Sequence, residues 1–220
     1  MHLLYTPLKL TISSIALIVL IGACNSNNTS TQKENIDQVR NQEMDDMIQR
    51  GAYLVTAGSC NDCHTPKKMT PQGPVDDSSR TLSGHPANSP LPPIDTKALQ
   101  PGNWILFAPD LTAFVGPWGI SYTANLTPDS ATGTGAWTED VFIKALRTGK
   151  HLGQENGRPI LPPMPWPSFG KLTDDDLKAI FAYLRSLPPI SNRVPAPISP
   201  QDAAKMATNN NAPVAEKMQR

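Results

Sequence analysis

Two cysteines and a histidine form the strongest chemical motif in the chain, Cys60-Asn61-Asp62-Cys63-His64. Two thiols three residues apart can each bond to one of the two vinyl groups on an edge of a porphyrin, and the imidazole that follows then lies beneath the iron. Imidazole is a good ligand for iron in either oxidation state. The spacing therefore predicts one covalently attached c-type haem, with His64 as an iron ligand.

Two other uses of a Cys-x-x-Cys pair are open to the same residues. Such a pair can act as a redox disulfide, or it can supply half of a zinc site. The redox use calls for a thioredoxin-like βαβ context, which the surrounding sequence does not show, and zinc calls for a second pair of ligands. The only other cysteine is Cys24, and the adjoining His64 favours haem over both alternatives.

A second iron ligand decides what a bound haem can do, and six side chains could provide it. Met164 is the best placed, because it lies in a Pro-rich loop, Leu161 to Pro165, that can hold a thioether rigidly. Met69 is too near His64 in the chain to reach the opposite face of a haem easily. The remaining candidates are more typical of helix packing or of plain loop positions: Met44, Met47, His85 and His151. The alternative for Met164 itself is a methionine that fills a gap in the core.

Three helices are expected to position these groups. The first is expected over about residues 45–58 and runs directly into the haem motif. The second is expected over residues 139–148, where Thr138 can cap the start and Gly149 can end the helix. The third is expected over residues 174–186, where apolar residues recur at every third or fourth position.

The rest of the chain divides by composition. Residues 24–43 are polar and rich in Asn, Ser, Thr and Gln, as in a flexible tether, and the folded domain is expected over residues 44–190. Residues 191–220 hold many prolines and are expected to form a disordered tail. The stretch from residue 67 to about 118 is punctuated by Pro and Gly, which predicts a long loop insertion wrapped around the haem.

The N-terminus has the pattern of an export signal. A lone Lys9 precedes fourteen mostly apolar residues, Leu10 to Ala23, a run too short for a membrane span and of the right length for a signal peptide. The run ends in small residues before Cys24, which resembles the site where bacterial lipoproteins are cleaved and acylated. Residues 1–23 are therefore expected to be a lipoprotein signal peptide. The exported chain would then be held by a lipid on Cys24 at a bacterial membrane, facing the periplasm or the outside. The alternative is an uncleaved anchor in which Cys24 is incidental.

Several stretches of the chain resemble class I c-type cytochromes, and more narrowly the haem-c domains in the cytochrome subunits of membrane-bound alcohol and gluconate dehydrogenases. The matching stretches are residues 51–58, 65–66, 125–129, 137–138, 142–149, 161–167 and the last helix. Those subunits carry three haem domains, whereas this chain has one motif, and its stretch from residue 67 to about 118 is longer. The resemblance implies an all-α cytochrome c fold with a single haem domain, in which His64 and Met164 are the axial ligands of the iron.

An iron with both axial positions filled has no open site for oxygen or peroxide, and a thioether ligand favours the reduced iron. The resemblance therefore implies an electron carrier and not an enzyme, with redox partners such as a membrane-associated dehydrogenase or an oxidase. The alternatives are a peroxidase-like haem enzyme or a haem-based sensor with a labile sixth ligand. The balance of 19 basic and 19 acidic residues does not indicate a nucleic-acid partner.

Overall fold

The computed structural model describes residues 27–210, and the side chains of residues 32–208. The expected signal peptide and Cys24 lie outside the described residues. Residues from Asn41 onward belong to one compact unit, and those before it form a separate unit. The helices, 3-10 turns (η) and strands are, in chain order, α1 (Asn27–Ala57), α2 (Cys60–His64), β1 (Lys67–Thr70), β2 (Gly73–Asp76), η1 (Ser78–Arg80), η2 (Thr96–Leu99), β3 (Leu106–Phe107), β4 (Ala113–Gly116), β5 (Gly119–Tyr122), α3 (Glu139–Thr148), η3 (His151–Gly153), α4 (Trp166–Phe169), α5 (Asp174–Ser186) and α6 (Pro200–Asn210).

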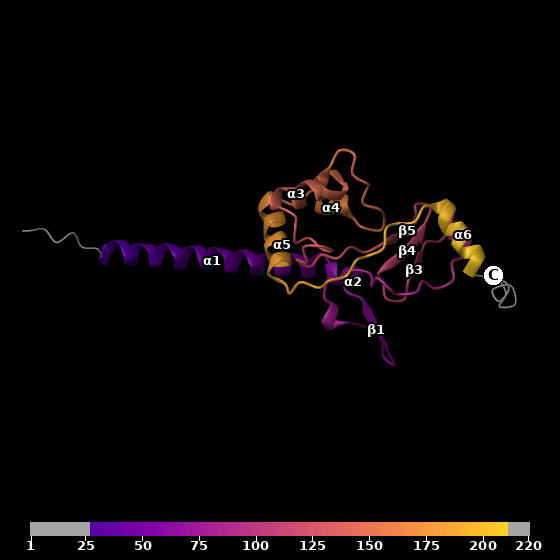
Figure 1. The fold of residues 1–220 in the computed structure, drawn as a ribbon, viewed down its shortest axis with the longest axis horizontal. Coiled ribbons are helices and arrows are strands. Elements are labelled where there is room, and N and C mark those ends of the chain that lie inside the picture. The colour runs from indigo at the N-terminus through magenta and orange to yellow at the C-terminus, as the bar shows by residue number, and fades with distance from the viewer. Residues whose placement is uncertain (1–26, 211–220) are drawn as a thin grey trace, which may run out of the picture. The chain divides into compact units, whose positions relative to one another are not determined.

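In the compact unit, helices α1, α3, α4 and α5 pack around one apolar cluster, here called the helical core (Figure 1). Phe142 of α3 stacks on Phe181 of α5 with ring centroids 5.2 Å apart. Helix α1 passes so close to α5 that a Cβ on Gly51 would lie 1.9 Å from the carbonyl oxygen of Ala179, so this crossing requires glycine. The buried members of the helical core are Val55, Leu82, Phe142, Leu146, Leu177, Ile180, Phe181 and Leu184.

Helices α3 and α5 have the bounds that the sequence predicts. Thr138 accepts a hydrogen bond from the backbone N–H of Val141, and Thr173 accepts one from Asp176. Gly149 ends α3 in the left-handed conformation, with φ at 66°. Because these caps satisfy backbone groups that have no partner inside the helix, both ends of α3 and the start of α5 are encoded locally.

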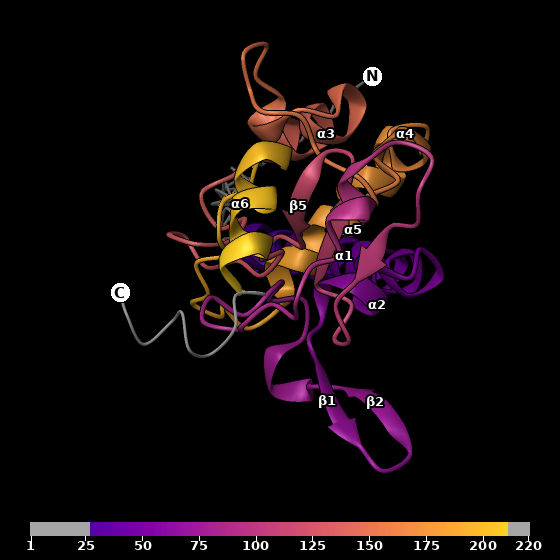
Figure 2. The same ribbon diagram turned by 90° about the vertical axis from the view of Figure 1, so that its right-hand side faces the viewer.

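The stretch between the haem motif and α3 contains strands, so the expected all-α architecture is not confirmed. Strands β1 and β2 form an antiparallel hairpin (Figure 2). Strands β3, β4 and β5 form an antiparallel sheet in that order (Figure 1). A second apolar cluster, here called the sheet core, packs on this sheet. Its buried members are Ile94, Ala98, Leu99, Val115, Ile120, Ala203 and Ala207. The segment expected to be a loop therefore builds much of a second core.

The expectation of a disordered tail is wrong for residues 191–210. Ile198 exchanges two backbone hydrogen bonds with Ile120 of β5, at 2.9 and 3.0 Å, and α6 follows. Ala203 and Ala207 of α6 are fully buried in the sheet core. Small alanines give no strong apolar pattern in the sequence, although they let the helix lie close against the sheet. Residues 211–220 lie outside the described range.

Helix α1 begins at Asn27, well before the start expected near residue 45, so residues 27–43 are helical where a flexible tether was expected. Most of its side chains from residue 32 to 46 are exposed, which explains why no apolar stripe marks this part. Gln, Lys, Glu and Arg are good helix formers, and Gln42 donates to the carboxylate of Asp46 at 2.8 Å. Within the described range, no helix is both long and apolar enough to cross a membrane.

Candidate functional site

The Cys-x-x-Cys-His motif forms one short helix, α2, directly after α1. Ser59 separates the two helices with a left-handed backbone, at φ 55°. Residues three and four apart share a helix face, so Cys60 lies on the same side of α2 as Cys63 and His64. The imidazole of His64 is buried and both cysteines are partly buried, without a disulfide between them. The motif thus presents two thiols and one imidazole together.

The His64 ring is oriented by a hydrogen bond from Nδ1 to the carbonyl oxygen of Ala124, at 2.8 Å. Since a carbonyl oxygen can only accept, Nδ1 carries the proton and the lone pair of the neutral ring is at Nε2. Burial lowers the pKa of His64, and the bond to Ala124 offsets this only in part. The neutral, correctly oriented ring is the form that ligates a metal, and such a bond to Nδ1 also fixes the ring and raises its basicity.

Gly84 allows the carbonyl oxygen of Ala124 to lie within hydrogen-bonding distance of Nδ1 of His64. The backbone of Gly84 has φ at +75°, and a Cβ there would lie 2.5 Å from the carbonyl carbon of Ala124 and from the oxygen of Thr123. The N–H of Gly84 also donates to the carbonyl of His64 at 2.8 Å. Any larger residue at this position would have to displace the group that orients the imidazole.

The cysteines do not have the properties of a redox pair. Burial raises the pKa of Cys60 to about 11 and also raises the pKa of Cys63. Reactive redox cysteines instead have a lowered pKa, because the thiolate is the nucleophile. Within the described residues, no group of three or more His, Cys, Asp and Glu side chains is arranged to hold a metal ion. The redox-disulfide and zinc alternatives therefore gain no support from this part of the chain.

Met164, the predicted second iron ligand, packs against the helical core, as does Cys60. Its loop is tied to the sheet, because the hydroxyl of Ser121 in β5 donates to the carbonyl of Pro162 at 2.6 Å. The indole of Trp118 in turn donates to the hydroxyl of Ser121 at 3.1 Å. The structure thus brings Met164 and the haem motif to one apolar cluster, with the methionine in a loop that is held in place.

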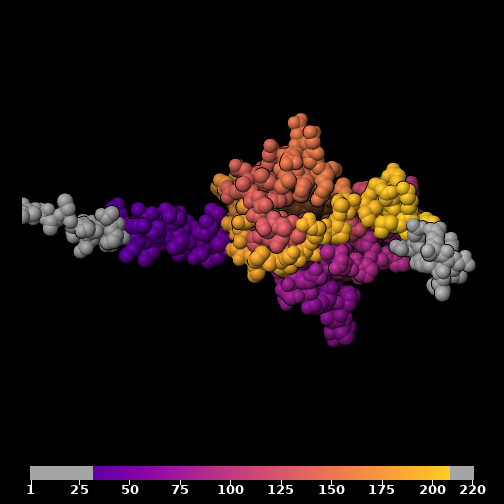
Figure 3. Space-filling model, viewed as in Figure 1, coloured from indigo at the N-terminus to yellow at the C-terminus, as the bar shows by residue number. Residues whose placement is uncertain are grey.

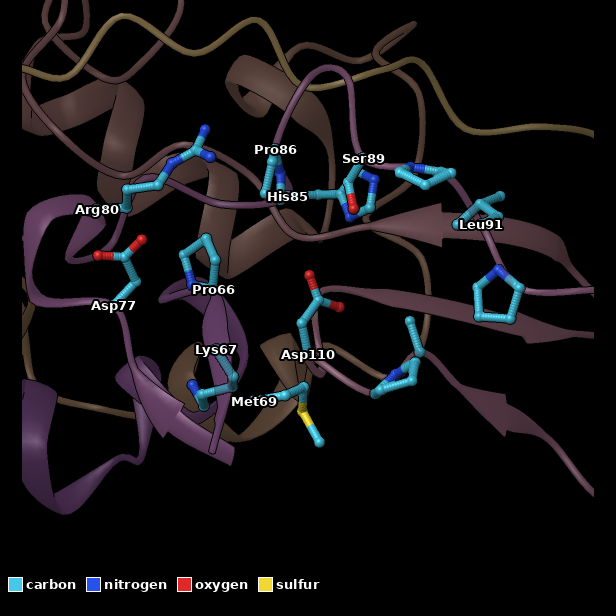
Figure 4. A pocket seen from close by; sticks show the side chains of 14 residues that line it. Pro66, Lys67, Met69, Asp77, Arg80, His85, Pro86, Ser89, Leu91 and Asp110 are labelled. Carbon is cyan, nitrogen blue, oxygen red and sulfur yellow. The ribbon is translucent and has the colours of Figure 1, made fainter. Parts of the chain in front are cut away.

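The other candidates for the second iron ligand lie in different surroundings. Met69 and His85 line a pocket next to the β1–β2 hairpin (Figure 4). Met69 is 65% exposed, and Nδ1 of His85 is hydrogen-bonded to the hydroxyl of Thr112 at 2.7 Å. His151 packs edge-on against Trp137, which borders the helical core, so it is the strongest alternative to Met164. The last two lie on α1: Met44 and Met47.

The groups that hold His64 in place carry little signal in the sequence. The acceptor at Ala124 is a backbone carbonyl, which any residue at that position provides. Gly84 is one of 14 glycines, and nothing in its neighbourhood marks it out. Two buried asparagines belong to the same network, Asn125 and Asn192. Of the two, only Asn125 could have been singled out from the sequence, since it lies in one of the stretches that carry the family resemblance.

Comparison with known proteins identifies the family of the chain. The family model described as Cytochrome c matches residues 48–188, a range that includes the haem motif and Met164. The cytochrome c subunit of gluconate 2-dehydrogenase from Pantoea cypripedii is 32% identical over 142 residues. The cytochrome c subunit of a quinone alcohol dehydrogenase from Gluconobacter oxydans is 28% identical over 152 residues, and the cytochrome subunit of fructose dehydrogenase from Gluconobacter japonicus is 28% identical over 137 residues.

These matches cover 64%, 69% and 62% of this chain, respectively, but only 23%, 24% and 20% of the relatives. The chain therefore spans less than a quarter of the length of each of these relatives. The resemblance to cytochrome subunits of alcohol and gluconate dehydrogenases is confirmed. Because the family model matches well over half of its residues, this chain belongs to the cytochrome c family.

Proposed function

We propose that this protein is a one-electron carrier that binds one haem c covalently through Cys60 and Cys63, with His64 and Met164 as the axial ligands of the iron. The observation that carries the proposal is the bond from Nδ1 of His64 to the carbonyl of Ala124, which leaves Nε2 of a neutral ring free to ligate. Family membership supports haem c as the cofactor.

Each protein group has a distinct task in this function. The thiols of Cys60 and Cys63 would fix the cofactor as thioethers, and His64 would ligate the iron through Nε2. Met164 would provide the second iron ligand, a soft thioether that favours ferrous iron over ferric iron and raises the reduction potential. A bound haem would supply a one-electron iron couple, reduced by the donor protein and reoxidised by the acceptor, and His64 and Met164 would leave no open iron site for oxygen or peroxide.

The partner is proposed from the names of the relatives. All three are named as cytochrome subunits, of gluconate, alcohol and fructose dehydrogenases. We therefore propose that this chain accepts electrons from a membrane-associated dehydrogenase and passes them on to a respiratory chain. It would do so outside the cytoplasm, because the N-terminal pattern is that of an exported lipoprotein.

Spectroscopy and a redox titration of the purified protein test the function. The ferric protein should show the weak far-red charge-transfer band of a methionine-ligated haem, and it should titrate reversibly with one electron. The ferrous protein should bind carbon monoxide only slowly, because Met164 must first leave the iron. A protein that lacks this band and binds carbon monoxide at once would favour the peroxidase-like or sensor alternative.

The lipid anchor gives a separate prediction. Changing Cys24 to Ser should release the protein from the membrane fraction or block its processing, because serine cannot form the thioether to a lipid. Mass spectrometry of the wild-type protein should find Cys24 as a modified N-terminus, and the matched control Ser30→Ala should stay with the membrane. An unmodified N-terminus at another residue would refute this prediction.

A further inference from the structure

We propose that Asn192 is a positioning residue for His64: it holds the backbone segments that orient the imidazole on the iron. This inference rests on the proposed role of His64 as an axial ligand. Asn192 lies in the connection between α5 and α6, far from the haem motif in the sequence. Figure 3 shows this connection, coloured orange to yellow, crossing the face of the compact unit to reach α6.

The side chain of Asn192 is only 4% exposed, and it makes three hydrogen bonds to one short segment. Its Nδ2 donates to the carbonyl of Ser83 at 2.7 Å and to that of His85 at 2.9 Å. Its Oδ1 accepts from the backbone N–H of Ala87 at 3.0 Å. One amide thus satisfies two carbonyls and one N–H of the segment 83–87. Within the described residues, no other side chain makes three hydrogen bonds to the backbone of this segment.

The segment that Asn192 holds is in direct contact with the groups around His64. Gly84 lies between the two bonded carbonyls, and its N–H donates to the carbonyl of His64 at 2.8 Å. Gly84 also packs directly on Ala124, the acceptor of Nδ1. In addition, the N–H of His85 donates to the carbonyl of Thr123 at 3.0 Å. Movement of Gly84 would therefore shift both the backbone of His64 and the acceptor of its ring.

The same connection also fixes the segment that carries the acceptor. Asn125, next to Ala124, donates to the carbonyl of Ile190 at 2.8 Å. The N–H of Asn192 donates to the hydroxyl of Thr132 at 3.0 Å, and this hydroxyl lies 3.2 Å from Nδ2 of Asn125. Residues 190–192 therefore connect the segment 83–87, which bonds the backbone of His64 through Gly84, to the segment that begins next to the acceptor at Ala124.

Asn192 lies beyond the range 48–188 that the family model matches. Its hydrogen bonds to the segment 83–87 are therefore contributed by the connection to α6, outside the matched range. A partner that fixes the Nδ1 bond of a ligating histidine raises the basicity of the ring, and a more basic ligand stabilises ferric iron. Loss of Asn192 should weaken that bond and favour ferrous iron. It would also leave buried carbonyls unpaired, which destabilises the fold.

The test compares Asn192→Ala with Ala207→Gly in the holo-protein. Both changes should lower the melting temperature, because Ala207 is fully buried in the sheet core. Only Asn192→Ala should raise the ratio of reduced to oxidised haem at a fixed solution potential, by about threefold or more. It should also shift the signals of the ferric haem in electron paramagnetic resonance. Loss of a group that orients a metal ligand commonly changes metal affinity or activity by about tenfold or more. If Asn192→Ala does not accumulate, Asn192→Ser, which keeps one short donor, should show a smaller change in the same direction.

Two results would overturn different claims. If Asn192→Ala behaves like Ala207→Gly in both potential and resonance signals, the role of Asn192 is only structural and the inference fails. If His64→Ala retains the wild-type haem spectrum, His64 is not the ligand and the proposed function itself fails. A His64→Ala variant that loses the wild-type spectrum, together with an unshifted Asn192→Ala, rejects the positioning role alone.

Discussion

The double replacement of Cys60 and Cys63 by alanine should leave almost no protein that carries haem. Both thiols lie on one face of α2 with the imidazole of His64, so a haem bound there would be held by two thioether bonds as well as by the iron. Without them only the axial ligands would hold the haem. The measurement is the fraction of haem that stays with the chain after denaturation in acid and organic solvent. In the wild-type protein all of the haem should stay with the chain.

The single variants and another cysteine variant provide the controls. Cys60→Ala and Cys63→Ala should each keep a part of the haem, because one thioether remains. Cys24→Ser also removes a cysteine, but it should keep all of the covalent haem in whatever protein accumulates. If haem extracts freely from the wild-type chain, the covalent attachment is excluded, although a non-covalent haem on His64 would remain open to test.

The helices around the site could be predicted where the signals were local. The bounds of α3 and the start of α5 followed from Thr138, Gly149 and Thr173, whose side chains or backbone close helix ends within one turn. The apolar spacing of these helices also gave the face that forms the helical core. Such features depend on neighbours three or four residues away, so a single sequence contains them.

The sheet could not be predicted because its strands are short and largely buried. Every residue of β4 is buried, and the strand has only four residues, so no alternation of apolar and polar side chains marks it. Its partner β3 has two residues. The sheet core is completed by α6, far along the chain, through the small side chains of Ala203 and Ala207. These elements are specified by contacts distant in sequence.

Of the proposed site, only the groups whose chemistry resides in a side chain could be named from the sequence. Cys60, Cys63, His64 and Met164 carry sulfur or imidazole and were all named from the sequence. The acceptor at Ala124 is a backbone atom, and its place depends on the close approach of Gly84. Asn192 has no neighbours in sequence that indicate burial. Supporting groups of this kind become visible only when the chain is folded.

Replacing Met164 with alanine should convert the carrier into a haem protein with an open iron site. His64 would still hold the iron, so the haem should remain bound, but the far-red charge-transfer band should vanish because no thioether ligates. Cyanide should bind the ferric form and carbon monoxide the ferrous form readily. The reduction potential should fall, since the soft donor that favours ferrous iron is lost, by a substantial part of the roughly 0.8 V that axial ligands can span.

Met69→Ala is the matched control, because it removes a thioether that is 65% exposed and lines the pocket next to the β1–β2 hairpin. It should leave the band, the ligand binding and the potential unchanged. If Met164→Ala keeps the wild-type spectrum and potential, another residue ligates the iron. His151 should then be replaced first, because it packs against Trp137 at the border of the helical core, whereas Nδ1 of His85 is already engaged by Thr112. A His151→Ala variant that opens the iron site would establish bis-histidine ligation, which lacks the soft donor and predicts a lower potential for the carrier.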